Sequence, residues 1–560
     1  FIAKIFFDRI NTSLNYTTNS SVNGAITRRR SSETQNLNGS FSYDLNWPQK
    51  DGFLPFKWLP FYQTLKDVEI FYLPSSIRYN TRFARNTRDQ RSFSAVAGVS
   101  PDTIANLNET FTLSETYSLK LAPLRSLNTD YTLSVNRDMR NSFAPTQFQF
   151  GRETNRNQQV SFNFTPRLTR WFTVNTQYSA NYREQFETGG QRTTYGNARR
   201  GLTVGNTNRI SGRFSFHLPA LFQPLARGRK EGFSIVQLIG KLGSSLQTVQ
   251  LNAFRNRAFN LFGLRDRPSL KFQLGLIDTT AVEVFNTAGV TRINTRVITD
   301  NASANSGLRL PAGFQTSTAA SYNHSRNFGN ANTEEEKVEF PSVSAGWRGM
   351  EGLPVFRWFF TSSSINFTYK ESKTKRGDGG LGDLFLTNDS KQTAFSPLFA
   401  WQARWKNQMS TSVQIRKTRN NDLRYQRNVG TDTTNVEPTL QERLIGTTIT
   451  EQSQLNATLR YALSSKFFKK LQSNLDFTME FGTGTNLQKE IPRSAALTDS
   501  VQAVIRRNEN TWRASLAAQY QFSSKFTGGT QLRHDSRKDK LRDLTNRVWE
   551  FRVWGEIRFN

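Results

Sequence analysis

The feature that most constrains this chain is an alternation of apolar and polar residues with a period of two, repeated from end to end. In residues 171–182, Phe172, Val174, Tyr178 and Tyr182 share one parity, and the positions between them are Thr, Asn, Gln and Ser. Successive side chains of a β-strand point to opposite faces of the sheet, so this segment is expected to form a strand with one apolar and one polar face. Roughly 18–22 segments of the chain show such a pattern, which predicts an all-β, antiparallel fold.

The length of these segments favours a transmembrane barrel over a soluble sandwich or propeller. Many run for about ten residues or more, the length that a tilted strand needs to cross a bilayer. The polar parity is rich in Asn, Thr, Ser, Gln and Arg, which suits a water-filled interior. Because lipid offers no hydrogen bonds, a spanning sheet has to close on itself or join a larger closed sheet. We therefore predict an antiparallel β-barrel of the bacterial outer membrane, with residues 1–560 forming one part of a very large barrel.

The apolar parity supplies the candidates for contact with lipid. Aromatic residues gather near several strand ends, as they do in the girdles of membrane barrels. The last strand is the clearest case, because most of its aromatic and aliphatic residues share one parity, most of its charged residues share the other, and it ends beside an aromatic residue. The predicted lipid-facing residues are Phe172, Val174, Tyr178, Tyr182, Leu516, Tyr520, Phe551, Val553, Ile557 and Phe559.

Composition excludes several other classes of protein. The net charge is +30 and only 36% of residues are hydrophobic, yet 12% are aromatic, which is far too many for a disordered chain of this charge. No apolar run approaches the roughly 20 residues of a transmembrane helix. The chain has no cysteine, so disulfides, thiolate catalysis and cysteine-ligated metals are excluded.

Segments that alternate poorly are expected to be loops or excursions from the barrel. The segment 218–243 contains two prolines and a basic cluster, and we expect a short helix or a plug-like insertion there. The chain begins without Met in what resembles the interior of a strand, so we expect it to be part of a longer protein. The predicted excursions are residues 189–208, 218–243, 291–313, 377–390 and 486–510.

Nothing in the sequence is typical of an enzyme. His217, His324 and His534 are far apart and lack metal-ligand spacing, and the acidic run 334–336 is best interpreted as solvated surface. The segment 377–383 faintly resembles a calcium-binding turn, but a single copy favours a flexible loop. We predict no catalytic residue, no metal and no cofactor.

The basic excess has several possible partners. Clustered Lys and Arg first suggest nucleic acid, but here they are dispersed over every strand pair, with no recognisable binding module. In an outer-membrane barrel they could instead meet lipopolysaccharide phosphates, line an aqueous channel, or be offset by an acidic partner. We predict no nucleic-acid binding.

A family resemblance is carried by linked motifs in the last 300 residues. A Pro-Trp-"GLxxLP"-like stretch runs from Pro341 to Pro354 and is followed by an aromatic and basic patch and a strand. A second pair of motifs, Phe395-Ser-Pro-Leu398 and Trp-Lys-Asn, comes next, and residues 267–276 resemble a "P-S…GL" element. The motif positions are Pro341, Trp347, Gly352, Leu353, Pro354, Pro397, Trp405, Lys406 and Asn407.

In these positions the chain resembles the C-terminal barrel portion of the SprA/Sov family, the outer-membrane translocon of the type 9 secretion system. The resemblance implies a protein-conducting channel that exports folded cargo proteins carrying a C-terminal sorting domain, without catalysis. It also implies partners: the N-terminal remainder of the barrel, a PorV-like barrel, a plug protein and the cargo. The alternatives are another outer-membrane transporter or porin and, from a different class, a soluble basic β-protein that binds polyanions.

Overall fold

The computed structural model describes most of the chain. The described residues are 9–25, 28–47, 52–54, 69–94, 102–140, 143–144, 147–148, 151–166, 169–186, 202–226, 240, 243–283, 294–310, 313–329, 332–379, 384–429, 440–463, 473–492, 503–523 and 525–557.

Twenty strands belong to one antiparallel sheet, and two short strands, β6 (Phe143–Ala144) and β7 (Gln147–Phe148), form a separate hairpin. The sheet strands are long, from 12 residues in β5 to 24 in β18. Their bounds are β1 Ile10–Ala25, β2 Arg28–Asn46, β3 Ser76–Ser94, β4 Asp102–Leu124, β5 Leu127–Asp138, β8 Arg152–Phe164, β9 Phe172–Phe186, β10 Leu202–Phe216, β11 Val249–Leu264, β12 Thr295–Arg309, β13 Phe314–Phe328, β14 Thr333–Arg348, β15 Phe360–Gly379, β16 Leu384–Trp405, β17 Ser410–Val429, β18 Leu440–Leu463, β19 Leu475–Pro492, β20 Val504–Gln521, β21 Phe526–Asp539 and β22 Leu544–Ile557. The helical elements are α3 Leu218–Ala226, α5 Leu270–Gln273, η2 Met350–Gly352 and η3 Phe356–Trp358.

The chain divides into two compact units. Unit 1 contains residues 1–169, 173–213 and 254–298, and unit 2 contains residues 170–172, 214–253 and 299–560. The residues of β9, β10, β11 and β12 are divided between the two.

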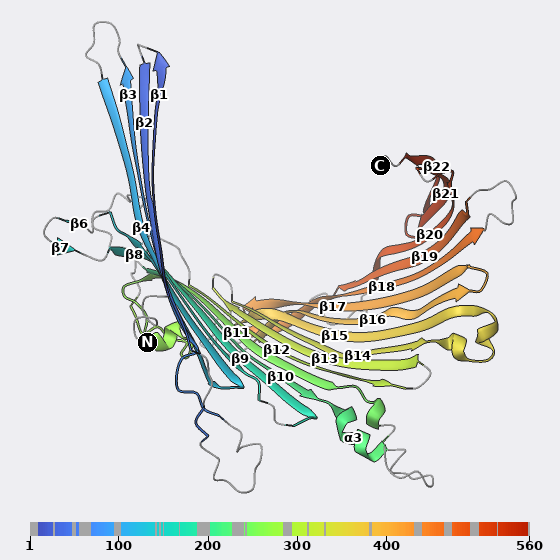
Figure 1. Cartoon of the computed structure of the whole chain (residues 1–560). Coiled ribbons are helices and arrows are strands. Elements are labelled where there is room, and N and C mark those ends of the chain that lie inside the picture. The colour runs from blue at the N-terminus through green and yellow to red at the C-terminus, as the bar shows by residue number, and fades with distance from the viewer. Residues whose placement is uncertain are drawn as a thin grey trace. The chain divides into compact units, whose positions relative to one another are not determined.

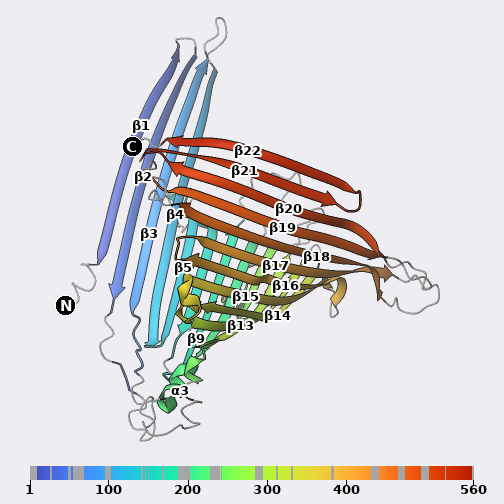
Figure 2. The ribbon, with the colours of Figure 1, turned by 90° about the vertical axis from the view of Figure 1, so that its right-hand side faces the viewer.

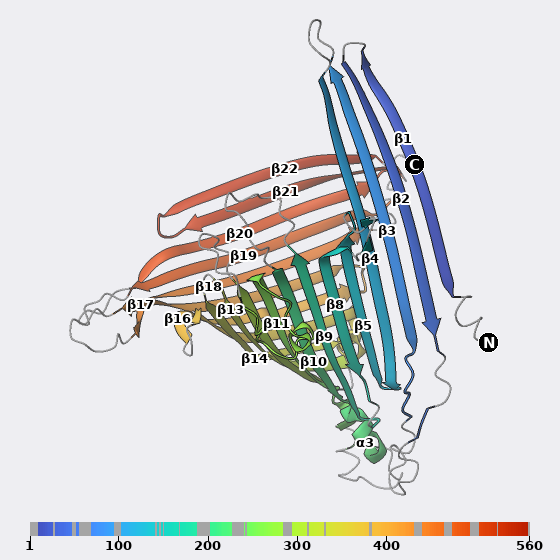
Figure 3. The ribbon, with the colours of Figure 1, turned by 90° about the vertical axis from the view of Figure 1, so that its left-hand side faces the viewer.

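In unit 1, strands β1 to β5, β8 and β9 pair in chain order, each antiparallel to the next (Figure 3). The core of this unit lies where residues 265–283, which we call the covering segment, pack on the sheet. Its buried residues come from the strands and from α5: Tyr182, Leu202, Val204, Phe259, Leu264 and Phe272. The ring of Phe272, in α5, meets the ring of Phe259 edge-on with centroids 5.9 Å apart.

In unit 2, strands β13 to β22 also pair in chain order (Figures 1 and 2). One end of this array carries the connections 349–359, 406–409 and 522–525, the last two of which are four residues long. We call this the short-turn end. Pro341 and Pro397 lie within β14 and β16 at shifts of strand register, the place where a strand tolerates a residue with no N–H donor.

The predicted all-β fold and the predicted number of strands are confirmed. One antiparallel sheet of twenty long strands is consistent with an outer-membrane β-barrel. In the described part of the chain, no helix has the length and apolar character needed to cross a membrane.

The predicted excursions are wrong in much of their extent, because the strands continue into them. Most of 291–313 is β12, most of 377–390 belongs to β15 and β16, and 486–510 is largely β19 and β20. Strand β10 begins within 189–208, and the rest of that segment lies outside the described residues. In 218–243 the expected short helix is present as α3, and residues 227–239 lie outside the described residues.

The physical reason is that polar residues on both faces remove the alternation without removing the strand. Cross-strand ion pairs hold these polar halves together. Arg376 lies 3.1 Å from Glu335, Lys391 lies 2.6 Å from Glu371, and Arg419 lies 3.4 Å from Glu451. Opposite charges on neighbouring strands stabilise a sheet much as apolar pairs do.

Candidate functional site

The strand register of unit 2 separates one apolar face from one polar face. Directly paired residues point to the same side of a sheet, so a series of register partners on successive strands traces one face. We call one such series, which crosses nine strands, the apolar row. It consists of Trp347, Ile365, Trp401, Val413, Ala457, Phe481, Ala514, His534 and Trp549.

One residue further along each strand, the chain of partners is polar at every position. This polar row points to the opposite face and consists of Arg348, Ser364, Gln402, Ser412, Thr458, Glu480, Ser515, Arg533 and Glu550. A sheet that is apolar on one side and polar on the other across nine strands is suited to lie between lipid and water.

Two groups of aromatic rings border the apolar face. Near the short-turn end, the ring centroid of Phe360 lies 4.6 Å from that of Trp405 and 5.9 Å from that of Trp401. Further along the strands, Tyr369 and Phe395 have centroids 4.9 Å apart.

The spacing of the two groups fits a bilayer. Phe360 and Tyr369 are nine residues apart in β15. At about 3.3 Å per residue and a tilt of about 40°, this distance corresponds to roughly 23 Å along the membrane normal. Outer-membrane barrels carry an apolar band about 25 Å tall between aromatic girdles.

In the C-terminal strands, most of the predicted lipid-facing residues lie on the apolar face and are exposed. The exposed fraction is 44% for Leu516, 68% for Phe551, 69% for Val553 and 57% for Ile557. Tyr520 is half-buried, with its ring 4.8 Å from that of Phe522. Phe559 lies outside the described residues.

In β9 the prediction is wrong at Tyr178 and Tyr182. The hydroxyl of Tyr178 donates a hydrogen bond to the backbone carbonyl of Leu274 in the covering segment. Phe172, Val174 and Tyr178 are half-buried, but Tyr182 is completely buried. Its hydroxyl donates a hydrogen bond to Glu184 at 2.9 Å, and the covering segment lies over this part of the strand. Tyr178 and Tyr182 therefore face protein and not lipid.

The covering segment is held on β8, β9 and β10 mainly by polar contacts. Arg267 lies 2.8 Å from the buried carboxylate of Glu184 and 2.6 Å from Glu153. Gln158 donates to Gln273 at 2.8 Å, and further side chains of β9 and β10 donate to backbone carbonyls of the segment. Alternation continues along the strand through this region, so the sequence alone could not show that its apolar parity changes neighbour from lipid to protein.

The motif positions of the C-terminal half gather mainly around the short-turn end of β14 to β17. Gly352 and Leu353 close the η2 turn, and the backbone amide of Lys406 donates to the carbonyl of Phe359 at 3.1 Å. Trp405 donates from Nε1 to Thr411 Oγ1 at 3.0 Å, and Asn407 accepts from the amide of Met409 at 3.2 Å. These residues build the turns that join the strands.

The most distinctive functional group was not predicted. Beside the turns, on the polar face, Arg348, Arg404 and Arg460 lie on the alternate strands β14, β16 and β18. We call these three residues the arginine row. Serines of the intervening strands stand opposite them: Ser364 opposite Arg348, Ser362 opposite Arg404, and Ser410 opposite both Arg404 and Arg460.

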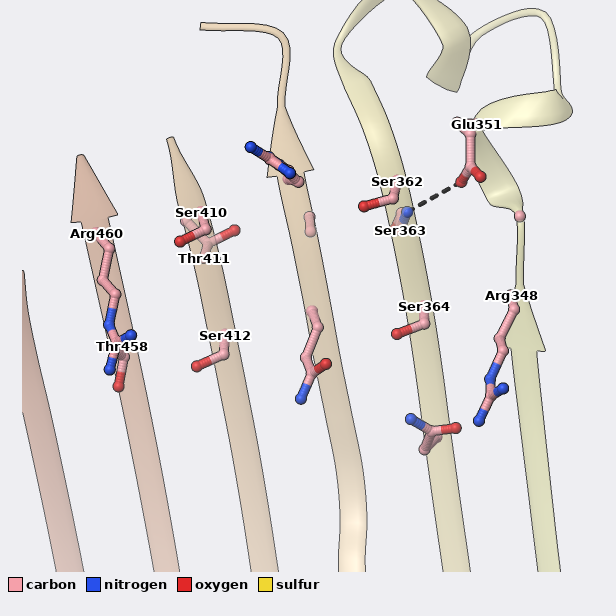
Figure 4. A pocket seen from close by; sticks show the side chains of 15 residues that line it. Arg348, Glu351, Ser362, Ser363, Ser364, Ser410, Thr411, Ser412, Thr458 and Arg460 are labelled. Atoms are coloured by element: carbon pink, nitrogen blue, oxygen red, sulfur yellow. Dashed lines mark hydrogen bonds between the residues drawn. The ribbon is translucent and has the colours of Figure 1, made fainter. Parts of the chain in front are cut away.

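These side chains line a hollow of about 660 Å³ on the polar face. Figure 4 shows the side chains of Arg348, Ser362, Ser364 and Arg460 among those lining it. The acidic residue at its rim, Glu351, accepts a hydrogen bond from the backbone amide of Ser363 at 2.9 Å. A sequence signal was present, because each arginine adjoins an aromatic residue at the end of a strand: Trp347-Arg348, Arg404-Trp405 and Arg460-Tyr461.

The three histidines lie apart and contribute to local packing. His324 Nε2 lies 2.5 Å from Glu334 Oε1, and the ring of His534 packs between Trp512 and Trp549, with centroids 4.5 and 4.0 Å away. Among the described residues, no three His, Cys, Asp or Glu side chains are grouped so that they could hold a metal ion.

No protein-family model and no curated protein matches the chain. It is similar to solved structures at low identity. The pyoverdine outer membrane receptor FpvA from Pseudomonas aeruginosa PAO1 is 8% identical over 98% of this chain and 79% of that one, with a TM-score of 0.27. Pseudomonas aeruginosa OccK7 (OpdD) is 10% identical over 98% and 97%, with a TM-score of 0.16. The outer membrane transporter YddB from Escherichia coli is 9% identical over 99% and 81%, with a TM-score of 0.23.

None of these proteins supports the SprA/Sov family in particular. At TM-scores this low the likeness does not specify a shared structure, so the assignment of faces depends on register and side chains.

Proposed function

We propose that this chain forms part of the wall of a water-filled transport barrel in the bacterial outer membrane. The observation that carries the proposal is the pairing of an apolar row with an adjacent polar row across nine strands. The apolar face, bordered by aromatic residues, contacts lipid, and the polar face lines the lumen. The chain catalyses no reaction and needs no cofactor, because transport here depends on a hydrated passage.

The polar face suits a large hydrophilic substrate. Ser, Thr, Gln and Asn hydrate well and present no apolar patch to which a folded protein would adhere. This supports the finer hypothesis of a type 9 protein translocon, whose other support is the set of linked motifs in the C-terminal half. In that hypothesis the partners are the rest of the barrel, a PorV-like barrel, a plug protein and cargo with a C-terminal sorting domain.

The second candidate is another kind of outer-membrane transporter or porin. The two faces and the aromatic groups support it equally, and it does not depend on membership of the SprA/Sov family. A soluble polyanion-binding protein is disfavoured by the large exposed apolar side chains of β22, such as Phe551 and Val553.

Purification from the outer membrane in mild detergent, with mass spectrometry of the co-eluting proteins, separates these candidates. Co-elution of a PorV-like barrel and sorting-domain cargo is expected for the translocon. A lone barrel that conducts ions in planar bilayers would support a porin or another transporter and contradict the translocon. A chain that stays monodisperse in water without detergent would contradict any membrane barrel.

A further inference from the structure

The arginine row differs from other cations on the same face of unit 2, because its guanidinium groups are not paired with acids. Arg513 lies 2.6 Å from Asp535, Arg537 lies 2.6 Å from Glu509, and Arg552 pairs with Glu550. For Arg348, Arg404 and Arg460, no acidic oxygen of the described residues lies within ion-pair distance, and all three side chains are exposed. Charge is therefore balanced at Arg513, Arg537 and Arg552 and unbalanced in the arginine row.

The spacing makes this arrangement stable without a counter-charge. Neighbouring strands are about 4.8 Å apart, so the backbones of Arg404 and Arg460, which share the register partner Ser410, are separated by roughly 10 Å. Arg348 is level with Gln402, two residues along the strand from Arg404. A separation of roughly 10 Å is close to the Debye length of about 8 Å at physiological ionic strength, so the mutual repulsion of the arginines is weak in water. Their potentials still add at the centre of the hollow, where a ligand would sit.

The chemistry of the hollow indicates the ligand. A guanidinium group binds a carboxylate or a phosphate through two parallel hydrogen bonds, and serine hydroxyls between the arginines can donate to the same oxygens. Glu351, the acid at the rim, is engaged by the amide of Ser363. The row therefore offers three anion-binding groups and adjacent hydroxyl donors.

The length of the row favours a multivalent ligand. The backbones of these arginines are roughly 10 Å apart or more, so a ligand with several spaced acidic groups fits the whole row better than a small anion does. Three residues of extended polypeptide span about the same distance, so spaced Asp or Glu side chains can engage all three arginines together. Linked contacts of this kind strengthen binding through effective concentration.

We propose that the arginine row is a binding site for acidic polypeptide segments at the short-turn mouth of the lumen. This inference depends on the proposed function, since it names the chemistry of the substrate surface that the wall recognises. The electrostatic field of the row concentrates acidic segments at this mouth.

The test measures binding of a fluorescein-labelled deca-glutamate peptide to the detergent-solubilised full chain by fluorescence anisotropy. The test variant is R348Q/R404Q/R460Q. The matched control is R513Q/R537Q/R552Q, which removes the same number of charges from the same face but takes them from existing ion pairs. Deca-glutamine serves as the uncharged peptide, and all titrations are made at constant ionic strength.

The wild type is expected to bind deca-glutamate, with affinity falling as salt rises, and not to bind deca-glutamine. The test variant is expected to bind at least tenfold more weakly, and the control variant within about threefold of the wild type. If the triple variant fails to fold, R404Q alone removes the central charge and should weaken binding severalfold.

Equal losses in the two triple variants would mean that only net charge matters and would overturn the proposal. Competition by inorganic phosphate as effective as that by the peptide would identify a small-anion site and would also overturn it. The wall proposal is tested separately, by detergent dependence and co-purification. Loss of peptide binding alone would therefore leave the wall proposal standing.

Discussion

The sharpest test of the two-faced wall is Leu516→Arg in β20. Leu516 lies on the apolar face between Met479 and Leu532, its partners on β19 and β21, and 44% of it is exposed. Trp512 and Tyr520 lie four residues to either side. Four residues at about 3.3 Å and a tilt of about 40° place Leu516 roughly 10 Å from each aromatic group, close to the centre of the apolar band.

A charged residue at that depth should destabilise the inserted state by about 2–4 kcal/mol. This corresponds to a loss of roughly 30- to 1000-fold in the equilibrium constant for folding. The measurement is an equilibrium urea titration of the full chain in lipid vesicles, with the folded fraction read from the heat-modifiable band on gels. Ala517→Arg is the matched control, because Ala517 lies on the polar face and its register partners Thr478 and Gln531 are polar. The control should change stability by no more than about 1 kcal/mol, within the range of ordinary surface substitutions. Equal effects at the two neighbouring positions would refute the assignment of faces.

Three further predictions concern β9, the covering segment and the aromatic group at Trp405. In the same titration, Val174→Arg should lower the free energy of unfolding by only about 1 kcal/mol, because Val174 lies two residues from Phe172 and therefore near the membrane–water interface. Asn175→Arg should be neutral, and a loss at Val174 as large as that expected at the bilayer midplane would contradict this depth. Arg267→Gln should destabilise the covering segment by about 3 kcal/mol, because it leaves the buried Glu184 carboxylate without its ion-pair partner, and hydrogen exchange in residues 265–283 should rise. Adding Glu184→Gln should restore part of the protection, and unchanged exchange in the single variant would be evidence that this ion pair does not hold the segment. Trp405→Ala should lower the free energy of unfolding by about 2 kcal/mol, because it removes the ring contacts and the hydrogen bond to Thr411. Trp405→Phe keeps a ring and should lower it by under about 1 kcal/mol; equal losses would show that the ring contacts contribute little.

How much the sequence predicted can be judged from particular strands. Strand β22 is clear because Phe551, Val553 and Ile557 share one parity and mostly polar residues share the other, and the structure leaves all three exposed on one face. Strand β12, Thr295–Arg309, was not predicted as a strand because polar residues occupy both of its parities. Alternation reports the contrast between two environments, so it disappears wherever a strand has water on both sides.

The arginine row was missed for a different reason. Each of its residues adjoins an aromatic residue at the end of a strand, but nothing in the sequence shows that Arg348, Arg404 and Arg460 are neighbours. Strand register brings Arg404 and Arg460 to one level of the polar face, and Arg348 to within two residues of that level, from positions more than fifty residues apart along the chain. The absence of acidic partners is likewise visible only in the folded sheet.

By itself, the sequence determined the fold class, the approximate number of strands and the existence of two faces, because side chains alternate along any strand regardless of its neighbours. Only the tertiary structure decided what each face meets. Tyr182 has the parity of a lipid-facing residue, yet it lies beneath the covering segment, whose side chains come from about eighty residues further along the chain. Environment is a property of what packs against a strand, and local periodicity carries no information about a distant partner.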